Sequence, residues 1–143
     1  VTTQAQILKL MKDLQQEFGM GMILITHNLG VVAQMADKIV VMYLGKVVEM
    51  ADTKTLFEDP KHPYTRELLR SIPKLSRERS TERLTAIRGN VPPPFARPSG
   101  CTFHPRCPQA IRGKCDVLEP TQTKLDEGRV VSCLLYEEDK EQS

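Results

Sequence analysis

The chain has 143 residues, of which 40% are hydrophobic, and its formal net charge is +2. This length suits one ordinary domain, or part of one with a small appendage. The sequence has neither an apolar run of membrane-spanning length nor a basic and apolar N-terminal signal, so we expect neither membrane insertion nor export. A helical pattern begins at Val1 without a start methionine, which predicts a piece of a longer protein.

The first 36 residues predict a helix, a strand and a second helix. Gly19 supplies a stop for the first helix. Residues 22–26 predict a strand buried on both faces, and Asn28 is a plausible N-cap for a helix through Met35. Apolar residues recur at helical spacing in the first helix: Ile7, Leu8, Met11, Leu14 and Phe18.

Two further strands are expected at 38–43 and 47–50, joined as a hairpin by a turn at Gly45-Lys46. A short helix ended by Pro60 and another helix ended before Pro73 follow. This order predicts an α/β fold, the trailing end of a mostly parallel sheet finished by antiparallel strands. Three carboxylates are expected to be solvated edge residues: Asp37, Glu49 and Asp52.

Composition divides the chain into three parts. Residues 1–75 carry the α/β pattern, and residues 76–98 form a Pro-rich linker, because consecutive prolines favour extended polyproline geometry. Residues 99–143 form a small irregular Cys-rich module with an acidic tail. That module has too few apolar residues to be held by burial alone, so it is expected to need a staple.

His27 directly follows the apolar run of residues 22–26. In an open α/β sheet, ligands bind just beyond the carboxyl ends of the strands. An imidazole placed there can donate a hydrogen bond to a phosphate oxygen and titrates near neutral pH. The alternative is a histidine with a purely structural role at a strand end.

All cysteines of the chain lie in the Cys-rich module, and they are Cys101, Cys107, Cys115 and Cys133. The short C-x2-C and C-x4-C spacings of zinc sites are absent. Disulfides would give the same stapling, but a chain without secretory features is expected in a compartment that keeps thiols reduced. Four thiolates suit an iron–sulfur cluster, whose charge Arg106, Arg112 and Lys114 would offset. Metal or cluster binding and free or paired cysteines remain the alternatives.

Basic residues concentrate between 61 and 114, whereas acidic residues dominate from 116 onward. A basic middle is compatible with phosphate contacts to nucleic acid. The aromatic side chains on which bases stack are not interleaved with these cations. We therefore expect no nucleic-acid partner, and expect the cations to face solvent, anionic headgroups or an anionic cofactor.

Several segments carry the motifs of one known family. Residues 62–69 (HPYTRELL) are similar to the His-Pro-Tyr-Thr segment that follows the nucleotide-binding core in the ATP-binding subunits of oligopeptide and dipeptide ABC transporters. Residues 100–108 (GCTFHPRCP), with Cys115 and Cys133, resemble its C-terminal cysteine motif. Residues 24–32 (LITHNLGVV) resemble its switch-histidine segment, and residues 1–4 resemble the stretch after its D-loop.

The resemblance implies a fold, a function and a location. Residues 1–75 would be the C-terminal part of a P-loop ABC ATPase domain, with His27 as sensor of the γ-phosphate. The full-length subunit would use ATP and Mg²⁺, and the four cysteines would hold a 4Fe–4S cluster. It would pair with a second ATPase subunit on transmembrane permease subunits at the cytoplasmic face of the membrane. An extracytoplasmic peptide-binding protein would deliver the cargo.

The chain also departs from the family pattern. It contains no G-x-x-x-x-G-K-S/T phosphate loop, no Leu-Ser-Gly-Gly-Gln signature and no Walker B Asp-Glu pair. We therefore expect this chain to bind ATP weakly or not at all and to be inactive alone. Its exposed sheet edges and apolar face predict marginal stability or self-association of residues 1–75. The alternative function is a non-catalytic module that binds metal, an iron–sulfur cluster or nucleic acid.

Overall fold

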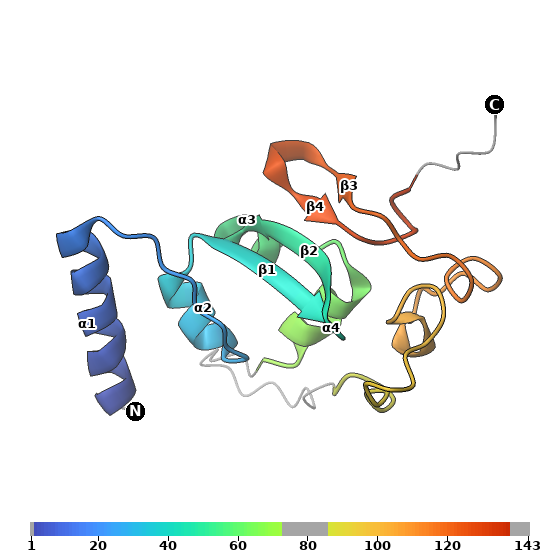
Figure 1. Cartoon of the computed structure of the whole chain (residues 1–143), viewed down its shortest axis with the longest axis horizontal. Helices are drawn as coiled ribbons and strands as arrows, with labels where there is room; N and C mark the ends of the chain where they lie inside the picture. Colours follow the sequence, from blue (N-terminus) through green and yellow to red (C-terminus); the bar gives the residue numbers. More distant parts are fainter. Residues whose placement is uncertain (1, 73–85, 138–143) are drawn as a thin grey trace, which may run out of the picture. The chain divides into compact units, whose positions relative to one another are not determined.

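The computed structural model describes residues 2–72 and 86–137 of the chain. These residues divide into two compact units, Val1–Asp37 and Lys38–Ser143. We call them the helical unit and the sheet unit and describe each by itself (Figure 1). No helix in the described ranges is both long and apolar enough to cross a bilayer. The predicted segments between 73 and 85 lie outside the described residues.

The helical unit contains α1 (Thr2–Phe18) and α2 (Leu29–Met35). Both predicted helices are confirmed. Gly19 follows α1 with φ at 59°, a left-handed conformation in which glycine carries no steric penalty. The Asn28 side chain accepts a hydrogen bond from the Val31 N–H at 3.2 Å, so the expected N-cap of α2 is also confirmed.

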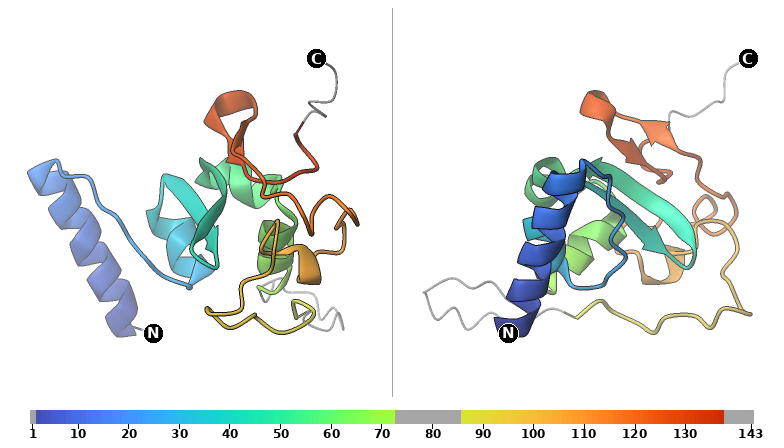
Figure 2. Two further views of the ribbon diagram at one scale, coloured as in Figure 1. Left: turned by 45° about the vertical axis from the view of Figure 1, so that its right-hand side comes forward. Right: turned by 60° about the vertical axis from the view of Figure 1, so that its left-hand side comes forward.

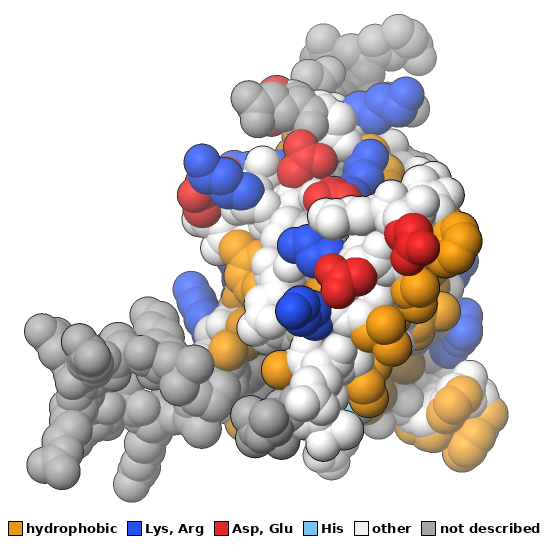
Figure 3. All heavy atoms as spheres, turned by 90° about the vertical axis from the view of Figure 1, so that its left-hand side faces the viewer, with side chains coloured by type: hydrophobic (Ala, Val, Ile, Leu, Met, Phe, Trp, Pro, Cys, Tyr) orange, Lys and Arg blue, Asp and Glu red, His pale blue; other side chains and the backbone are white. Residues whose placement is uncertain are grey.

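The predicted strand at residues 22–26 was wrong for this structure. No strand is assigned there, and the side chains of Ile23 and Ile25 are 92% and 94% exposed. An apolar run becomes a strand only when a neighbouring strand satisfies its N–H and C=O groups, and no described strand pairs with this segment. Figure 3 shows hydrophobic side chains exposed beside charged ones.

The sheet unit begins with the hairpin of β1 (Lys38–Tyr43) and β2 (Lys46–Asp52). Its antiparallel register runs from Lys38 opposite Asp52 to Tyr43 opposite Lys46, so the predicted hairpin is confirmed with a longer second strand and a turn one residue earlier than expected. The turn is Leu44–Gly45, and both residues have positive φ, at 46° and 78°. Two successive positive φ values are typical of the tight turns that match the twist of a hairpin.

Two more strands, which the sequence analysis missed, extend this hairpin from the Cys-rich module. They are β3 (Thr123–Lys124) and β4 (Val130–Val131), and the sheet order is β1-β2-β4-β3 with all pairs antiparallel. Both views of Figure 2 show the β3–β4 ribbon continuing beyond β2. The module expected to be irregular thus completes the sheet of the preceding α/β segment. No parallel pair occurs among the described strands.

Two helices pack against the hairpin, α3 (Thr53–Glu58) and α4 (Pro63–Arg70). Both were expected, and α4 ends earlier than the Ile72 boundary that the sequence suggested. Pro63 opens α4, where its missing N–H costs nothing, because the first N–H groups of a helix have no intrahelical partner. The short 3-10 turns η1 (His104–Arg106) and η2 (Asp126–Gly128) lie in the Cys-rich module.

The module is anchored to the hairpin by an aromatic cluster. Phe103 is fully buried, and its ring centroid lies 5.2 Å from that of Tyr43 and 5.4 Å from that of Tyr64. Edge-to-face contacts of this kind stabilise by about 0.5–1.5 kcal/mol each beyond the area that they bury. Burial against β1 and α4 therefore contributes to holding the module, in addition to any staple between its cysteines.

Candidate functional site

His27 lies in the helical unit, between the unpaired segment 22–26 and α2, and its side chain is exposed. The neighbouring Asn28 N–H donates to the Thr26 hydroxyl at 3.0 Å, which orients the turn into the helix. The structure places the histidine directly before a capped helix, as the sequence predicted, but no strand precedes it in the described part of the chain. Its role toward a phosphate remains a prediction.

The sheet unit brings all four cysteines together. Cys101, Cys107, Cys115 and Cys133 line one cavity of about 10 Å³, although 32 residues separate the first from the last along the chain. The Cys101 N–H donates to the Cys115 carbonyl at 2.8 Å, which fixes two of the cysteine segments side by side. The end of β4 delivers Cys133 to the same place.

Every one of these sulfurs has a backbone N–H directed at it. The Ile111 N–H donates to the Cys115 Sγ at 3.3 Å. Backbone N–H groups of Phe103 and His104 act on Cys101, that of Gln109 acts on Cys107, and that of Leu135 acts on Cys133. Amides that point at sulfur stabilise a thiolate over a thiol, and they are among the groups that tune iron–sulfur sites.

Burial has the opposite effect to these amides on the pKa values of the cysteines. It raises the pKa of Cys133 to about 12 and raises the pKa values of Cys101 and Cys107 above their usual range. The neighbouring sulfurs add to this shift, because one thiolate disfavours ionisation of the next. The thiols of Cys101, Cys107 and Cys133 are therefore protonated at neutral pH, and a bound metal would displace their protons.

The volume of the cavity and the arrangement of its side chains limit the group that the cysteines can hold. Within the described ranges, no three His, Cys, Asp or Glu side chains are arranged to ligate one ion. A volume of about 10 Å³ has room for about one water molecule. Thiols with amides aimed at them are the donor type that a thiolate-ligated metal or cluster uses, but the four side chains are not arranged here to ligate one ion. A four-iron cluster would require the thiols to rotate apart.

The cations expected beside the cysteines are partly engaged elsewhere. The Arg106 guanidinium donates to the carbonyls of Arg88 at 3.0 Å and Gly89 at 3.3 Å, and to the Tyr43 hydroxyl at 3.4 Å. Arg106 therefore ties residues 87–89 to the sheet. Arg112 is exposed.

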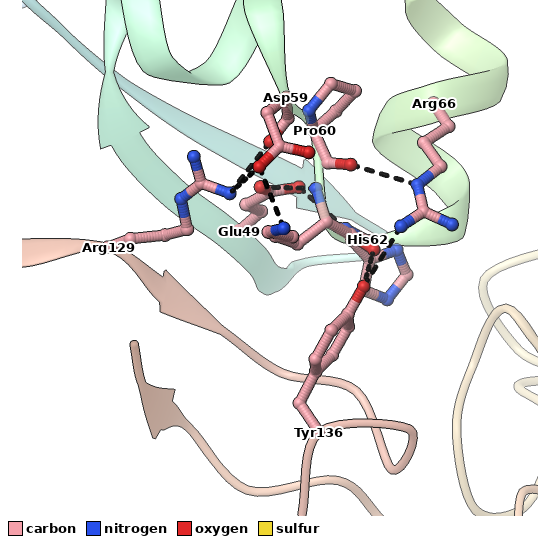
Figure 4. Close-up of polar contacts among 8 residues, drawn as sticks. Glu49, Asp59, Pro60, His62, Arg66, Arg129 and Tyr136 are labelled. Atoms are coloured by element: carbon pink, nitrogen blue, oxygen red, sulfur yellow. Dashed lines mark hydrogen bonds and ion pairs between the residues drawn. The ribbon is translucent and has the colours of Figure 1, made fainter. Parts of the chain in front are cut away.

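The loop of residues 59–62, which joins α3 to α4, lies beside the cavity and is bound by Glu49 of β2. The expectation that Glu49 is solvated was wrong: its side chain is fully buried. Its two carboxylate oxygens accept the N–H groups of Lys61 and His62, each at 2.9 Å (Figure 4). The periodicity of the sequence did not indicate that a buried side chain of β2 would accept hydrogen bonds from two N–H groups of this loop. Asp37 and Asp52 are exposed, as expected.

Three further side chains hold the same loop from outside. Arg129 donates to the Asp59 carbonyl at 2.8 Å, and Arg66 donates through Nε to the Pro60 carbonyl at 2.9 Å. The Tyr136 hydroxyl donates to the Lys61 carbonyl at 2.6 Å and accepts from Arg66 at 3.1 Å (Figure 4). The loop is therefore fixed jointly by α4 and by the Cys-rich module.

His62 ends this loop and lines the cysteine cavity. Its side chain is 1% exposed, and its Nδ1 accepts the Tyr64 N–H at 3.0 Å, which caps α4. Burial lowers the pKa of His62 to about 4, so the ring is neutral at pH 7. In the sequence His62 stood out only as part of a motif, although Pro63 marks the first position of a helix and so places His62 at its N-cap.

Comparison with known proteins identifies the class. Residues 48–115 match the family described as "Oligopeptide/dipeptide transporter, C-terminal region". These residues run from β2 through the loop and α4 to the third cysteine. This match covers nearly half of the chain, and the resemblance drawn from the His-Pro-Tyr and cysteine motifs is confirmed.

Individual relatives extend the match to nearly the whole chain. The chain is 51% identical over 139 residues to the oligopeptide transport ATP-binding protein AppD of Bacillus subtilis, and 46% identical over 133 residues to the dipeptide transport ATP-binding protein DppD of Escherichia coli. These alignments cover 97% and 93% of this chain but 42% and 40% of the relatives. The chain therefore spans about two fifths of their length and corresponds to the C-terminal region of such a protein.

Proposed function

We propose that this chain is the C-terminal region of the ATP-hydrolysing subunit of an ABC importer for oligopeptides or dipeptides. The observation that carries the proposal is the 51% identity to an oligopeptide transport ATP-binding protein over 97% of the chain. The full-length subunit binds ATP and Mg²⁺, works with a second ATPase subunit, and drives transmembrane permease subunits from the cytoplasmic face of the membrane. An extracytoplasmic binding protein supplies the peptide.

In this function His27 acts at the γ-phosphate. The exposed imidazole before α2 donates a hydrogen bond that holds the nucleotide and the attacking water in line. The chain has no phosphate loop to cradle the remaining phosphates. The 143-residue chain alone is therefore inactive, and hydrolysis belongs to the full-length subunit.

We assign the four cysteines to a 4Fe–4S cluster that serves the same subunit. Support comes from their convergence on one cavity and from the backbone amides aimed at their sulfurs. Such a cluster supplies a one-electron redox centre and a covalent staple for the module. Cys101, Cys107, Cys115 and Cys133 would hold it.

Transport is tested in the full-length subunit, assembled with its permease in proteoliposomes and supplied with labelled peptide. We expect His27→Ala to lower ATP turnover about 100-fold, as loss of one transition-state contact does, with little change in nucleotide binding. Gln34→Ala, at an exposed position of α2, is the matched control. Undiminished turnover of the His27 variant would contradict the assigned role, and ATP-independent peptide uptake would contradict the function.

The cluster is tested on the chain itself, expressed anaerobically with iron. We expect brown protein with about four irons per chain, and loss of colour when any one cysteine is replaced by Ser. Ser99→Ala is the matched control, because it removes one hydrogen bond of the module, to the Asp116 carbonyl, without removing a sulfur. Colourless, iron-free protein that is still ordered around Cys107 and Cys115 would contradict the assignment.

A further inference from the structure

Residues 90–98 form a Pro-rich loop whose two ends are held in the sheet unit. Before the loop, the Arg106 guanidinium donates to the Arg88 carbonyl at 3.0 Å. After the loop, the Ser99 hydroxyl donates to the Asp116 carbonyl at 2.7 Å. The loop is therefore fixed at both ends and does not hang from one end as a free tail would.

Within the loop, a tight turn carries Phe95. The Ala96 N–H donates to the Pro93 carbonyl at 2.9 Å, so Pro94 and Phe95 are the two central residues of a β-turn. Proline suits the first of these positions, because its ring presets φ to the value that the turn requires. Three successive prolines precede Phe95 and restrict the backbone further. The phenylalanine is thus presented on a stiff segment.

The Phe95 side chain is 91% exposed. Burying a phenylalanine stabilises by about 1.5–3 kcal/mol, so the fold gains almost nothing from this ring. Phe103, a few residues further along, is fully buried in the aromatic cluster that anchors the module. An aromatic ring exposed on a pre-ordered backbone is typical of the residues that dominate binding at protein interfaces, because little conformational entropy is lost on docking.

The chain around the loop carries positive charge alone. Residues 86–114 contain five Lys or Arg residues and no Asp or Glu. The side chains of Arg88, Arg97 and Arg112 are exposed. Electrostatic complementarity steers association and fixes orientation at an interface. A surface that receives Phe95 is therefore expected to surround an apolar pocket with acidic residues.

A single exposed ring fits a protein pocket better than a lipid surface. Insertion of one phenylalanine into a bilayer gains about 1.5–3 kcal/mol. Even a myristoyl chain, with far more apolar surface, gives only marginal membrane binding. In a protein pocket, close packing and exclusion of water raise the contribution of one aromatic residue to about 2 kcal/mol or more.

We propose that residues 90–98 are a docking loop, whose Phe95 ring inserts into an apolar pocket with an acidic rim on another subunit of the transporter. The inference rests on the proposed function insofar as the partner is sought among the subunits of that transporter. It gives the segment predicted as a linker a binding role of its own.

The test uses the full-length subunit assembled with its permease subunits and second ATPase subunit. The photoreactive residue p-benzoylphenylalanine replaces Phe95, and crosslinked peptides are mapped by mass spectrometry. We expect a crosslink to another subunit at apolar residues flanked by Asp or Glu. The same replacement at Leu118, which is 51% exposed in the same unit but outside the loop, is the matched control and should not give this crosslink. Crosslinks to lipid alone, or none from position 95, would overturn the proposal.

Variants measure the contribution of the ring to affinity for the remaining subunits. We expect Phe95→Ser to weaken binding about 30-fold, as loss of a dominant interface residue does. Arg97→Gln should weaken it less and make it less sensitive to salt. Val117→Ser, at a position that is 64% exposed, is the matched control and should bind as wild type does. An unchanged affinity of Phe95→Ser would overturn the docking role.

Folding is checked on the 143-residue chain by denaturant titration. Phe95→Ser should unfold at the same denaturant concentration as wild type, because the ring is already in water. A large loss of stability would show that the ring is buried in solution and would overturn the proposal. A complex that binds the Phe95 variant weakly but takes up no peptide with ATP would support the docking role and contradict the proposed function.

Discussion

The helical unit exposes apolar residues, whereas the sheet unit buries charged ones. In the helical unit, Ile23 and Ile25 are almost fully exposed although their sequence predicts a buried strand. In the sheet unit, charged Glu49 and Arg129 are buried, and each has hydrogen-bond partners in the loop between α3 and α4. Burial of a segment therefore depends on partners for its polar backbone groups and not on its own hydropathy alone.

The sheet unit finds those partners far along the chain. Its β2 pairs with β4 from near the C-terminal end of the described chain, and the loop at residues 59–62 is held by side chains on both sides of it in sequence. The helical unit contains only local helices among its described residues. Substitutions should therefore cost far more stability in the sheet unit than in the helical unit.

The largest effect is expected at Gly100, whose φ is +67°. An added Cβ would lie 2.4 Å from the Cys115 carbonyl oxygen and 2.8 Å from the Asp116 carbonyl carbon. We expect Gly100→Ala to lower the free energy of unfolding by about 2–5 kcal/mol, because a left-handed conformation and overpacking add. Gly113→Ala, also at positive φ but with open space around it, should cost about 1–2 kcal/mol in denaturant titration. Equal costs would contradict the close apposition of the cysteine segments.

Acid should weaken the sheet unit through His62. Burial lowers the pKa of this imidazole from 6.5 to about 4, so the unfolded chain binds the extra proton between these values. The stabilisation is fully present above pH 6.5 and is lost as the pH falls toward 4, by about 3 kcal/mol in total. The difference between wild type and His62→Asn in denaturant titrations across this range isolates the contribution. A difference that does not change with pH would show that His62 is not buried in a neutral state.

The Glu49 carboxylate should contribute somewhat less than His62 to the free energy of unfolding. Glu49→Gln keeps the size of the side chain but turns one acceptor toward a backbone N–H into a donor. We expect a loss of about 2 kcal/mol in the free energy of unfolding, since a buried N–H is left without a partner. Glu58→Gln, at an exposed position of α3, should leave stability unchanged. A stability loss no larger than that of the control would argue against the buried carboxylate.

The smallest effect is expected in the helical unit. The double substitution Ile23→Ser/Ile25→Ser should change the free energy of unfolding by less than about 0.5 kcal/mol, because both side chains are already in water. It should also reduce self-association in light scattering. Ile39→Ser, in β1 with 8% exposure, is the buried counterpart and should cost about 3 kcal/mol. A large loss from the double substitution would show that residues 22–26 are buried in solution.

Local signals in the sequence predicted local structure well. Both helices of the first unit, the β1–β2 hairpin and the Asn28 cap follow from periodicity, turn chemistry and capping, which act within a few residues. The strand predicted at 22–26 was wrong, and β4 was missed, for the same reason. The pairing of a strand depends on partners that are distant in sequence. The sequence analysis treated the four cysteines as one group, and in the structure they line one cavity. The place of His62 beside them depends on the loop geometry, which spacing along the chain does not encode.

Hydrogen exchange on the 143-residue chain tests most directly the central claim, that the hairpin, α4 and the Cys-rich module form one cooperative unit. We predict that amides of β2, α4 and β4 open with one common free energy, whereas amides of residues 22–26 exchange with almost no protection. Fast exchange around Cys115 and Cys133, with β1 and β2 still protected, would contradict the claim.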